Sequence, residues 1–457
     1  ETFRDGGTFH VLVISGLHIT FIGGIILLIV RRFTRQRIWQ FAVTSSVLWV
    51  YSFAVGAQIP VMRAALMFTI LLFSFVIYRK RNLLNALGGC AFLILILQPS
   101  ALLNQSFQLT FASLVGIIGV AFPLVEKLRA IGSWRPSRKI PFPPAIGKTL
   151  RQFCEILYWS ELKWKKSLSE NLWSCSISKA ETAAKLEDIG LQKPLRWIFE
   201  GILVTAIVQV FLLPFLVFYF HRISFTSVLL NLWVGLFTVL QNITAIVTII
   251  FAQISGTLAQ PLIMLTELFN WLLLFLPRIF ISADVASTRI PVYSESFRAI
   301  YFLYFVPVVV IVGLVNLWDP FRTESQHNTK SAFPATRVFY ISFAAFLFLF
   351  CVIVFHPFST SPADGRLTVE FLDVGQGDSI FVKFPNGRTM LVDGGGKHNF
   401  HGNLIERKDG AVEEFEPDIQ GIGESVVSEF LWERGYSQIE FLVATHSDAD
   451  HIQGLAS

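Results

Sequence analysis

Two histidines and two aspartates fall within six residues near the end of this 457-residue chain, in the run Thr445-His446-Ser447-Asp448-Ala449-Asp450-His451. The run follows a short apolar stretch, residues 439–444, that predicts a buried strand. Imidazole and carboxylate groups at the exit of a strand, where a loop turns inward, are the donor set of a divalent metal site. We therefore interpret all four residues as metal ligands, with Asp450 also catalytic. The alternative is a polar loop that contains them by chance.

The spacing H-x-D-x-D-H resembles the H-x-H-x-D-H signature of the metallo-β-lactamase fold. The resemblance implies two ions in the complete domain, one held by His446 and Asp448 and the other by Asp450 and His451. Asp448 occupies the slot that usually holds histidine. Because a carboxylate is a harder ligand than imidazole, it favours Mn²⁺ or Mg²⁺ over Zn²⁺. The identity of the metal stays open, and the expected cofactor is a divalent ion, Mn²⁺ or Zn²⁺.

Two further aspartates are expected to order the loop that carries the four predicted ligands, residues 445–451, without binding the metal themselves. We call this loop the metal loop. Asp393, in Leu391-Val-Asp-Gly-Gly-Gly396, matches the early aspartate of the same fold, which orders the metal loop through hydrogen bonds. Asp378, in the run 371–379 with sequence FLDVGQGDS, is given the same role. For Asp393 the competing interpretation is a glycine-rich turn with a structural aspartate.

The elements that must position these residues form a soluble α/β segment from about residue 366. Strand-length apolar runs lie at 367–372, 379–384 and 389–392, and Pro385-Asn386-Gly387 predicts a hairpin turn. Residues 425–434 are expected to be helical. The segment is expected to be the N-terminal part of an α/β (αββα) metallo-β-lactamase-like domain, because the chain stops too early for a complete one.

The composition before this segment is that of a membrane protein. Apolar residues make up 53% of the chain and charged residues 15%, against about a quarter in soluble domains. This excludes a disordered chain and an ordinary soluble domain. A membrane-spanning helix needs roughly 20 apolar residues, and we predict about ten spans, at 10–30, 38–56, 59–78, 83–103, 105–125, 198–220, 226–253, 258–281, 299–318 and 338–356.

Basic residues predict the orientation of these spans. The segments after the first, third and fifth spans are basic (31–37, 79–81 and 126–196), whereas those after the second and fourth carry no Lys or Arg. Basic loops prefer the cytoplasmic side. With ten spans, the N-terminal stub and everything after residue 357 then lie outside the cytoplasm.

The segment 126–196 is a predicted cytoplasmic insertion that holds 14 Lys and Arg against 7 Asp and Glu. Apolar residues recur in it near helical spacing at Phe153, Leu157, Trp164, Leu168 and Leu172. A helix on the inner membrane surface fits this pattern, and so does a solvated loop with one packed helix. Nucleic-acid binding is the weaker alternative, because topology and anionic lipid already account for the charge.

Three motifs together resemble the ComEC family of competence proteins. They are FLDVGQGDS at 371–379, HVLVISGLH at 10–18 and PVMRA at 60–64. The resemblance implies a competence-type membrane domain over 1–357, a linker at 358–365 and a partial metallo-β-lactamase-like domain over 366–457. The family's N-terminal OB-like domain would precede Glu1, and its remaining metal ligands would follow Ser457.

Polar residues within the spans are candidates for a channel lining. His10, Ser15, His18 and Arg63 lie in or at the ends of apolar spans, where ionisable groups are costly and usually functional. The alternatives are neutral histidines satisfied by neighbouring helices, interfacial snorkelling of Arg63, and close helix packing at Ser15. Glu267, Gln241 and Asn242 are further candidates.

The ComEC resemblance implies a bacterial inner-membrane channel that takes up single-stranded DNA in natural transformation. Its external metal-dependent domain would hydrolyse the strand left outside, through two-metal chemistry. The implied partners are single- and double-stranded DNA, the lipid bilayer, a DNA receptor and a cytoplasmic helicase, with a homo-oligomer as an option. Two other classes stay open, a membrane-anchored hydrolase of small phosphoesters and a channel with a non-catalytic C-terminal domain. The fragment by itself is expected to be inactive.

Overall fold

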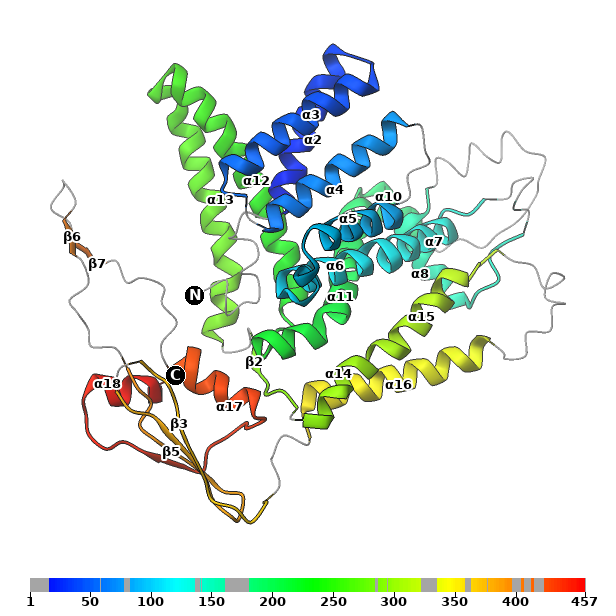
Figure 1. The fold of residues 1–457 in the computed structure, drawn as a ribbon. Coiled ribbons are helices and arrows are strands. Elements are labelled where there is room, and N and C mark those ends of the chain that lie inside the picture. Colours follow the sequence, from blue (N-terminus) through cyan, green and yellow to red (C-terminus); the bar gives the residue numbers. More distant parts are fainter. Residues whose placement is uncertain are drawn as a thin grey trace.

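The structure is a computed structural model with a helical region (residues 16–357) and a C-terminal unit (residues 363–456) (Figure 1). It describes residues 16–57, 59–77, 83–135, 140, 142–160, 181–283, 287–293, 295–321, 335–357, 363–375, 377–396, 404–406, 412–414 and 423–456.

The first helices of the helical region follow the predicted apolar runs closely. They are α2 (Gly16–Phe33), α3 (Arg37–Ala54), α4 (Ile59–Val76) and α5 (Leu83–Leu97). A short 3₁₀ helix η2 (Pro99–Leu103) leads to α6 (Gln105–Gly116), which continues through the π-helical turn η3 (Ile117–Ala121) into α7 (Phe122–Gly132). Asn104 begins α6 by accepting hydrogen bonds from the backbone N–H groups of Ser106 and Phe107, as an N-cap does.

The later helices differ widely in length, and two short strands lie between them. They are α8 (Lys148–Tyr158), α10 (Glu181–Asp188), α11 (Gln192–Phe220), α12 (Ser227–Ile254), α13 (Gly256–Ser282), η4 (Glu295–Arg298), α14 (Ala299–Leu303), α15 (Phe305–Leu317) and α16 (Ala335–Phe355). Strand β1 (Arg222–Ile223) pairs antiparallel with β2 (Thr288–Arg289). A buried cluster that includes Val217, Val308 and Ile353 joins α11, α15 and α16.

Each of the ten predicted spans overlaps at least one helix, and among the described residues six helices are long and apolar enough to cross a membrane. The six are Gln105–Gly132, Gln192–Phe220, Ser227–Ile254, Gly256–Ser282, Ala299–Leu317 and Ala335–Phe355. Residues 61–76 and 83–97 form shorter apolar helices. The protein is therefore a multi-pass membrane protein, and the number of ten spans stays a prediction.

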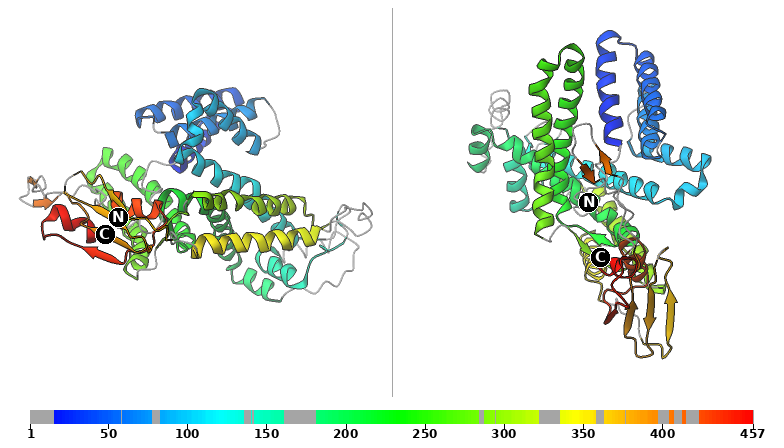
Figure 2. Two further views of the ribbon diagram at one scale, coloured as in Figure 1. Left: turned by 60° about the horizontal axis from the view of Figure 1, so that its bottom comes forward. Right: turned by 90° about the vertical axis from the view of Figure 1, so that its left-hand side faces the viewer.

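Several contacts join ends of helices that are distant in the sequence. The turn of the α12–α13 hairpin and the turn between α2 and α3 lie at the end farthest from the C-terminal unit (Figures 1 and 2). Arg37 at the start of α3 donates to the carbonyl oxygen of Phe75 near the end of α4, at 3.1 Å. The Nζ atom of Lys127 on α7 lies 2.6 to 2.8 Å from three carbonyl oxygens at the end of α15.

The basic insertion 126–196 is shorter than predicted, because the flanking helices extend into it. Helix α7 continues to Gly132 and α11 begins at Gln192. Within it, α8 buries Leu157 against α7 and α11, whereas Phe153 stays 41% exposed. The described part of the insertion contains two helices, α8 and α10, and both interpretations of the segment stay predictions. Trp164, Leu168 and Leu172 lie outside the described residues.

The C-terminal unit is built on a four-stranded sheet in the order β3-β4-β5-β8. Strands β3 (Thr368–Phe371), β4 (Ile380–Lys383) and β5 (Thr389–Val392) are antiparallel, and β8 (Phe441–Val443) runs parallel to β5. The predicted turn at 385–387 joins β4 to β5, with Gly387 at φ +85°, which glycine adopts without a side-chain clash. A separate hairpin pairs β6 (Leu404–Glu406) with β7 (Val412–Glu414).

One face of the sheet is covered by the predicted helical segment, here η6 (Gly423–Ser428) and α17 (Glu429–Glu433). Phe381 and Leu391 of the sheet pack against Val427 and Leu431 of this segment. The chain then passes through β8 to α18 (Ala449–Ile452) and η7 (Gln453–Ala456). The three predicted strands and the helix are confirmed, whereas the metallo-β-lactamase fold itself stays a prediction.

The prediction of a buried strand at 439–444 is wrong in its burial. Strand β8 is only three residues long, and its side chains are 39 to 58% exposed. Among the described residues it is an edge strand of the sheet, with β5 as its neighbour. Its apolar side chains therefore lack the packing that a central strand receives on both faces.

Candidate metal centre

The candidate metal centre forms where two neighbouring parallel strands end. Val392 of β5 is paired with Val443 of β8, so the residues after both strands emerge at the same edge of the sheet. The backbone N–H of Asp393 donates to the carbonyl oxygen of Val443 at 2.8 Å, which ties the two exits together. The predicted metal loop therefore begins beside Asp393.

Asp393 is the hydrogen-bonding centre of this edge. Its carboxylate accepts from the backbone N–H of Thr445 at 2.8 Å and from the Thr445 hydroxyl at 2.6 Å. The Nδ1 atom of His451 lies 3.0 Å from its Oδ2. Burial raises the pKa of Asp393, but these hydrogen bonds outweigh that effect and hold the pKa below its ordinary value. A buried carboxylate at this place is thus stabilised in its charged form.

Asp393, His446 and His451 each offer one ligand atom, and the three atoms lie within 4.8 Å of one another. The rings of His446 and His451 have their centroids 3.8 Å apart. Because Nδ1 of His451 faces Asp393, its Nε2 is the nitrogen available to a metal. The hydrogen bond to Asp393 also raises the pKa of His451 above its ordinary value. Two imidazoles and a carboxylate suit a transition-metal ion.

The other two predicted ligands stand beside this group. Asp448 is exposed, with its Oδ2 atom 3.5 Å from Nε2 of His446. The Oδ1 atom of Asp450 is buried and has no hydrogen-bond partner among the described residues. A buried carboxylate oxygen without a donor is the kind of group that a cation satisfies. The predicted division of the four ligands between two ions stays a prediction, because the structure instead groups His446 and His451 with Asp393.

Glycines allow the metal loop to approach the strand exits. A Cβ atom at Gly377 would lie 1.7 Å from the carbonyl oxygen of Asp450, and one at Gly394 would lie 2.6 Å from the backbone of Gly454. The neighbouring Asp378 accepts a hydrogen bond from the N–H of Gly395 through its backbone carbonyl, at 3.0 Å. The run 371–379 therefore contacts the site through its backbone, and a role for the Asp378 side chain stays a prediction.

The predicted channel residues are placed only in part. His10 and Ser15 lie outside the described residues, and His18 lies in α2. Arg63 on α4 is 3% exposed, and its Nη2 atom donates to the hydroxyl of Ser106 at 2.6 Å. Among the further candidates, Gln241 of α12 donates to Asn270 of α13 at 3.4 Å, and Glu267 is exposed on α13. Ser106, the partner of Arg63, was not among the predicted residues.

Comparison with known proteins decides the family. The family model described as Competence protein matches residues 1–314. The chain belongs to the competence protein family. The predicted ComEC membership is thereby confirmed. ComE operon protein 3 from Bacillus subtilis (strain 168) is 25% identical over 253 residues, which cover 55% of this chain and 28% of that relative. No solved structure matches the chain.

This competence protein also has a junction between its two parts that sequence reasoning missed. Glu424 of η6 forms ion pairs with Arg222 of β1 and with Arg289 of β2, the latter at 3.1 Å. The backbone N–H of Val292 donates to the carbonyl oxygen of Trp432 at 2.8 Å, and the guanidinium of Arg289 lies 5.1 Å from the Trp432 ring centroid. These contacts join positions more than a hundred residues apart, so no local pattern signals them.

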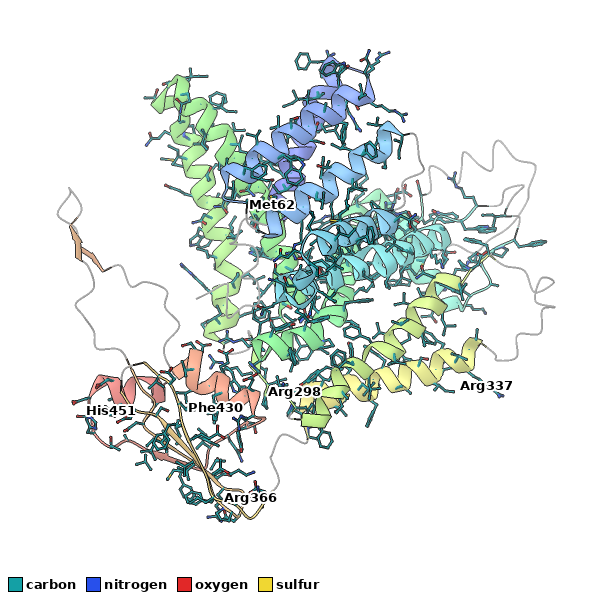
Figure 3. All side chains as sticks on the ribbon, viewed as in Figure 1. Met62, Arg298, Arg337, Arg366, Phe430 and His451 are labelled. Carbon is teal, nitrogen blue, oxygen red and sulfur yellow. The ribbon has the colours of Figure 1, made fainter. Side chains whose placement is uncertain are left out.

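Arg298, labelled in Figure 3, extends the same junction toward α14. Its Nη2 atom donates to the carbonyl oxygen of Glu433 at the end of α17, at 3.3 Å. His451 lies on α18, at the other end of the C-terminal unit in this view. The competence protein thus holds its C-terminal unit through η6 and α17, and the candidate metal centre is not part of that contact.

Proposed function

We propose that this competence protein takes up single-stranded DNA across the bacterial cytoplasmic membrane in natural transformation. We propose further that its C-terminal domain, in the complete protein, hydrolyses the strand that stays outside. The transport part rests on family membership over residues 1–314. The hydrolytic part rests on the grouping of Asp393, His446 and His451.

In the hydrolytic proposal, His446, Asp448, Asp450 and His451 would hold one or two divalent ions. Bound metal ions would activate water and offset charge on the scissile phosphate. Asp393 orients His451 through the 3.0 Å hydrogen bond and keeps Nε2 directed away from itself. Thr445, held by Asp393 through its backbone and its hydroxyl, fixes the start of the loop. Asp450, with its unpartnered Oδ1 atom, is the residue that we assign to catalysis.

The test is metal-dependent cleavage of double-stranded DNA by the full-length protein. We expect Asp450→Asn to lower the cleavage rate at least about a hundred-fold, because loss of a catalytic group usually costs that much. The matched control is Asp364→Asn, since Asp364 is an exposed carboxylate whose partners are Lys383, at 3.5 Å, and the backbone N–H of Arg366, at 3.1 Å. Cleavage by Asp450→Asn at the wild-type rate would contradict a nuclease and favour a channel with a non-catalytic domain. Cleavage of a small phosphodiester but not of DNA would favour the anchored hydrolase.

The proposed topology places the C-terminal unit on the non-cytoplasmic side. Contacts between loops support it. Arg222 follows the sixth predicted span, Arg289 follows the eighth and Glu424 follows the tenth, so their ion pairs need one common side. Lys127, after the fifth span, contacts the end of α15, where the ninth predicted span ends. An alternating path of ten spans satisfies both contacts.

The insertion 126–196 would then be cytoplasmic, where a helicase could contact it, and a DNA receptor would act on the opposite side.

Cysteine labelling in cells tests this topology. The four native cysteines are first replaced by serine, and a single cysteine is then introduced at Asn386 or at Ser133. Cells are treated with a membrane-impermeant maleimide after any outer membrane is permeabilised. Both positions are exposed in the structure. We expect labelling at 386 in intact cells, and at 133 only after lysis. The reverse pattern would contradict the proposed orientation.

A further inference from the structure

Arg63 lies in an environment that leaves most of its guanidinium group unsatisfied. The side chain is 3% exposed, and one nitrogen, Nη2, donates to Ser106 at 2.6 Å. The other two nitrogens, Nε and Nη1, are buried and have no hydrogen-bond partner among the described residues. Because burying an unpaired charge is costly, proteins seldom keep such a group without a partner. The missing partner of Arg63 should be an anion.

A pocket of about 210 Å³ is lined in part by Arg63. Its walls come from α4, the end of α5, η2 and the start of α6, and its polar lining consists of Arg63, Gln98, Ser100 and Asn104. No Asp or Glu lines it, so nothing in its wall opposes a negative charge. Met62, the residue before Arg63, marks the place in Figure 3, at the end of α4 that faces the middle of the molecule.

The size and the donors of this pocket select a small oxyanion. The volume is below the roughly 300 to 1,000 Å³ of sites for drug-sized ligands, so a whole nucleotide or peptide does not fit. A guanidinium, an amide and a hydroxyl are donors suited to the oxygens of a phosphate group. The N-terminus of the twelve-residue helix α6 also lies at the pocket. The N–H groups of Ser106 and Phe107 are capped by Asn104, so the helix contributes the favourable field of its dipole rather than free donors.

We propose that this pocket, the Arg63 pocket, binds one phosphate-type oxyanion. The phosphate has two chemical sources, a phosphodiester of a DNA strand and a lipid headgroup. The DNA source rests on the proposed function and deepens it, since it gives the strand a single-phosphate contact in the membrane region. In the proposed topology the end of the fourth span and the start of the fifth, which line the pocket, lie on the same side as the C-terminal unit. A DNA strand that enters from that side would reach Arg63 near the start of its path through the membrane region.

The primary test measures binding of inorganic phosphate to the full-length protein in a phosphate-free detergent, by titration calorimetry. We expect Arg63→Gln to weaken phosphate binding about ten-fold or more, because it removes a charge-assisted hydrogen bond. Arg278→Gln, at an exposed arginine of α13, is the matched control and should bind like wild type. Equal affinity of wild type and Arg63→Gln would overturn the proposal.

A second pair of variants keeps the proposal testable if Arg63→Gln does not fold. Ser100 is exposed and lines the pocket, so substitutions there leave the buried guanidinium in place. Ser100→Asp should weaken phosphate binding about ten-fold through like-charge repulsion, whereas the neutral Ser100→Asn should stay within about two-fold. Equal binding by the two variants would contradict an anion in this pocket.

Competition experiments identify the source of the phosphate. A short oligothymidine with phosphodiester linkages should displace inorganic phosphate, whereas the same oligomer with uncharged methylphosphonate linkages should not. Dihexanoyl phosphatidylglycerol is the lipid probe. Arg63-dependent binding of the lipid without any binding of the oligomer would support the pocket and contradict its use by DNA. This result would mean that the pocket binds phosphate but that DNA does not supply it. The loss of all phosphate binding in wild type would instead mean that the pocket is not an anion site.

Discussion

The Nδ1 atom of His451 lies 3.0 Å from Oδ2 of Asp393, although the two residues are 58 positions apart. The contact forms because β5 and β8 are parallel neighbours, so both residues follow strand ends at one edge of the sheet. The carboxylate fixes one nitrogen of the histidine and thereby determines which nitrogen faces the candidate metal centre. The geometry of the site thus depends on a residue that comes long before the histidine-rich motif.

The first prediction concerns metal affinity. Asp393→Asn in the full-length protein should weaken Mn²⁺ or Zn²⁺ binding about 10- to 100-fold, because the outer hydrogen bond to a metal-binding histidine contributes that much. Titration calorimetry with each metal measures the effect. Asp364→Asn, on an exposed turn of the same unit, serves as the control and should bind metal like wild type. An unchanged affinity in Asp393→Asn would show that Asp393 is only a structural residue of the turn.

The second prediction is a pH dependence in the metal-free protein. The folded pKa of His451 is raised, so the stabilisation from its charged form is complete below its unfolded pKa and is lost as pH rises through the folded value. The folded pKa of Asp393 is lowered, so its contribution is complete above the unfolded pKa and is lost as pH falls through the folded value. The pair therefore stabilises the loop most at pH values between about 4 and 6.5, the ordinary pKa values of the two groups.

Hydrogen exchange of residues 445–452, corrected for the intrinsic rate at each pH, measures this effect with a chelator present. Protection in wild type should decline above the window as His451 loses its proton. In Asp393→Asn the decline should be absent, because the variant lacks the carboxylate that raises the pKa. Identical profiles in the two proteins would contradict the ion pair.

Sequence reasoning predicted the local parts of this molecule well. Residues 380–383 and 389–392 form strands because alternating and β-branched apolar residues flank a Pro-Asn-Gly turn, and that information is contained within a dozen residues. The apolar helices are equally local. The metal-loop residues were assigned from their types and spacing as well, and that assignment stays a prediction.

Contacts between distant residues could not be read in this way. Nothing near Arg63 indicates that its guanidinium meets Ser106, 43 positions later, and nothing near Glu424 indicates Arg222. The exposed strand β8 was misjudged for a related reason. An apolar run indicates a preference for burial, but the number of neighbours that a strand has is a property of the whole sheet.

The third prediction tests the close approach of the metal loop to the run 371–379. Gly377 and Gly375 have nearly equal φ angles, +79° and +78°, so alanine suffers similar backbone strain at both. Only at Gly377 would the added Cβ meet the backbone of Asp450, whereas at Gly375 it would meet nothing within 4 Å. Gly375→Ala should therefore cost about 1 kcal/mol and keep metal binding. Gly377→Ala should displace Asp450 and abolish metal-dependent cleavage. Calorimetry and DNA cleavage by both variants measure the difference, and equal activity would contradict the contact.

The last prediction concerns the junction between the helical region and the C-terminal unit. Glu424 is mostly buried between Arg222 and Arg289, with 13% of its side chain exposed. Glu424→Gln removes the charge that both arginines face, and we expect the free energy of docking to fall by about 2 kcal/mol, as for a lost hydrogen bond to a charged group.

Glu370→Gln is the matched control, because Glu370 forms a 2.9 Å ion pair with Arg434 at the protein surface. Such exposed pairs contribute less than about 1 kcal/mol. Hydrogen exchange at residues 423–433, in the full-length protein, measures the opening of the junction. We expect exchange there to accelerate by more than ten-fold in Glu424→Gln and by less than five-fold in Glu370→Gln, since 1.4 kcal/mol corresponds to a factor of about ten. If both variants exchange alike, the carboxylate of Glu424 does not hold the two parts together, and the backbone contact between Val292 and Trp432 must be sufficient.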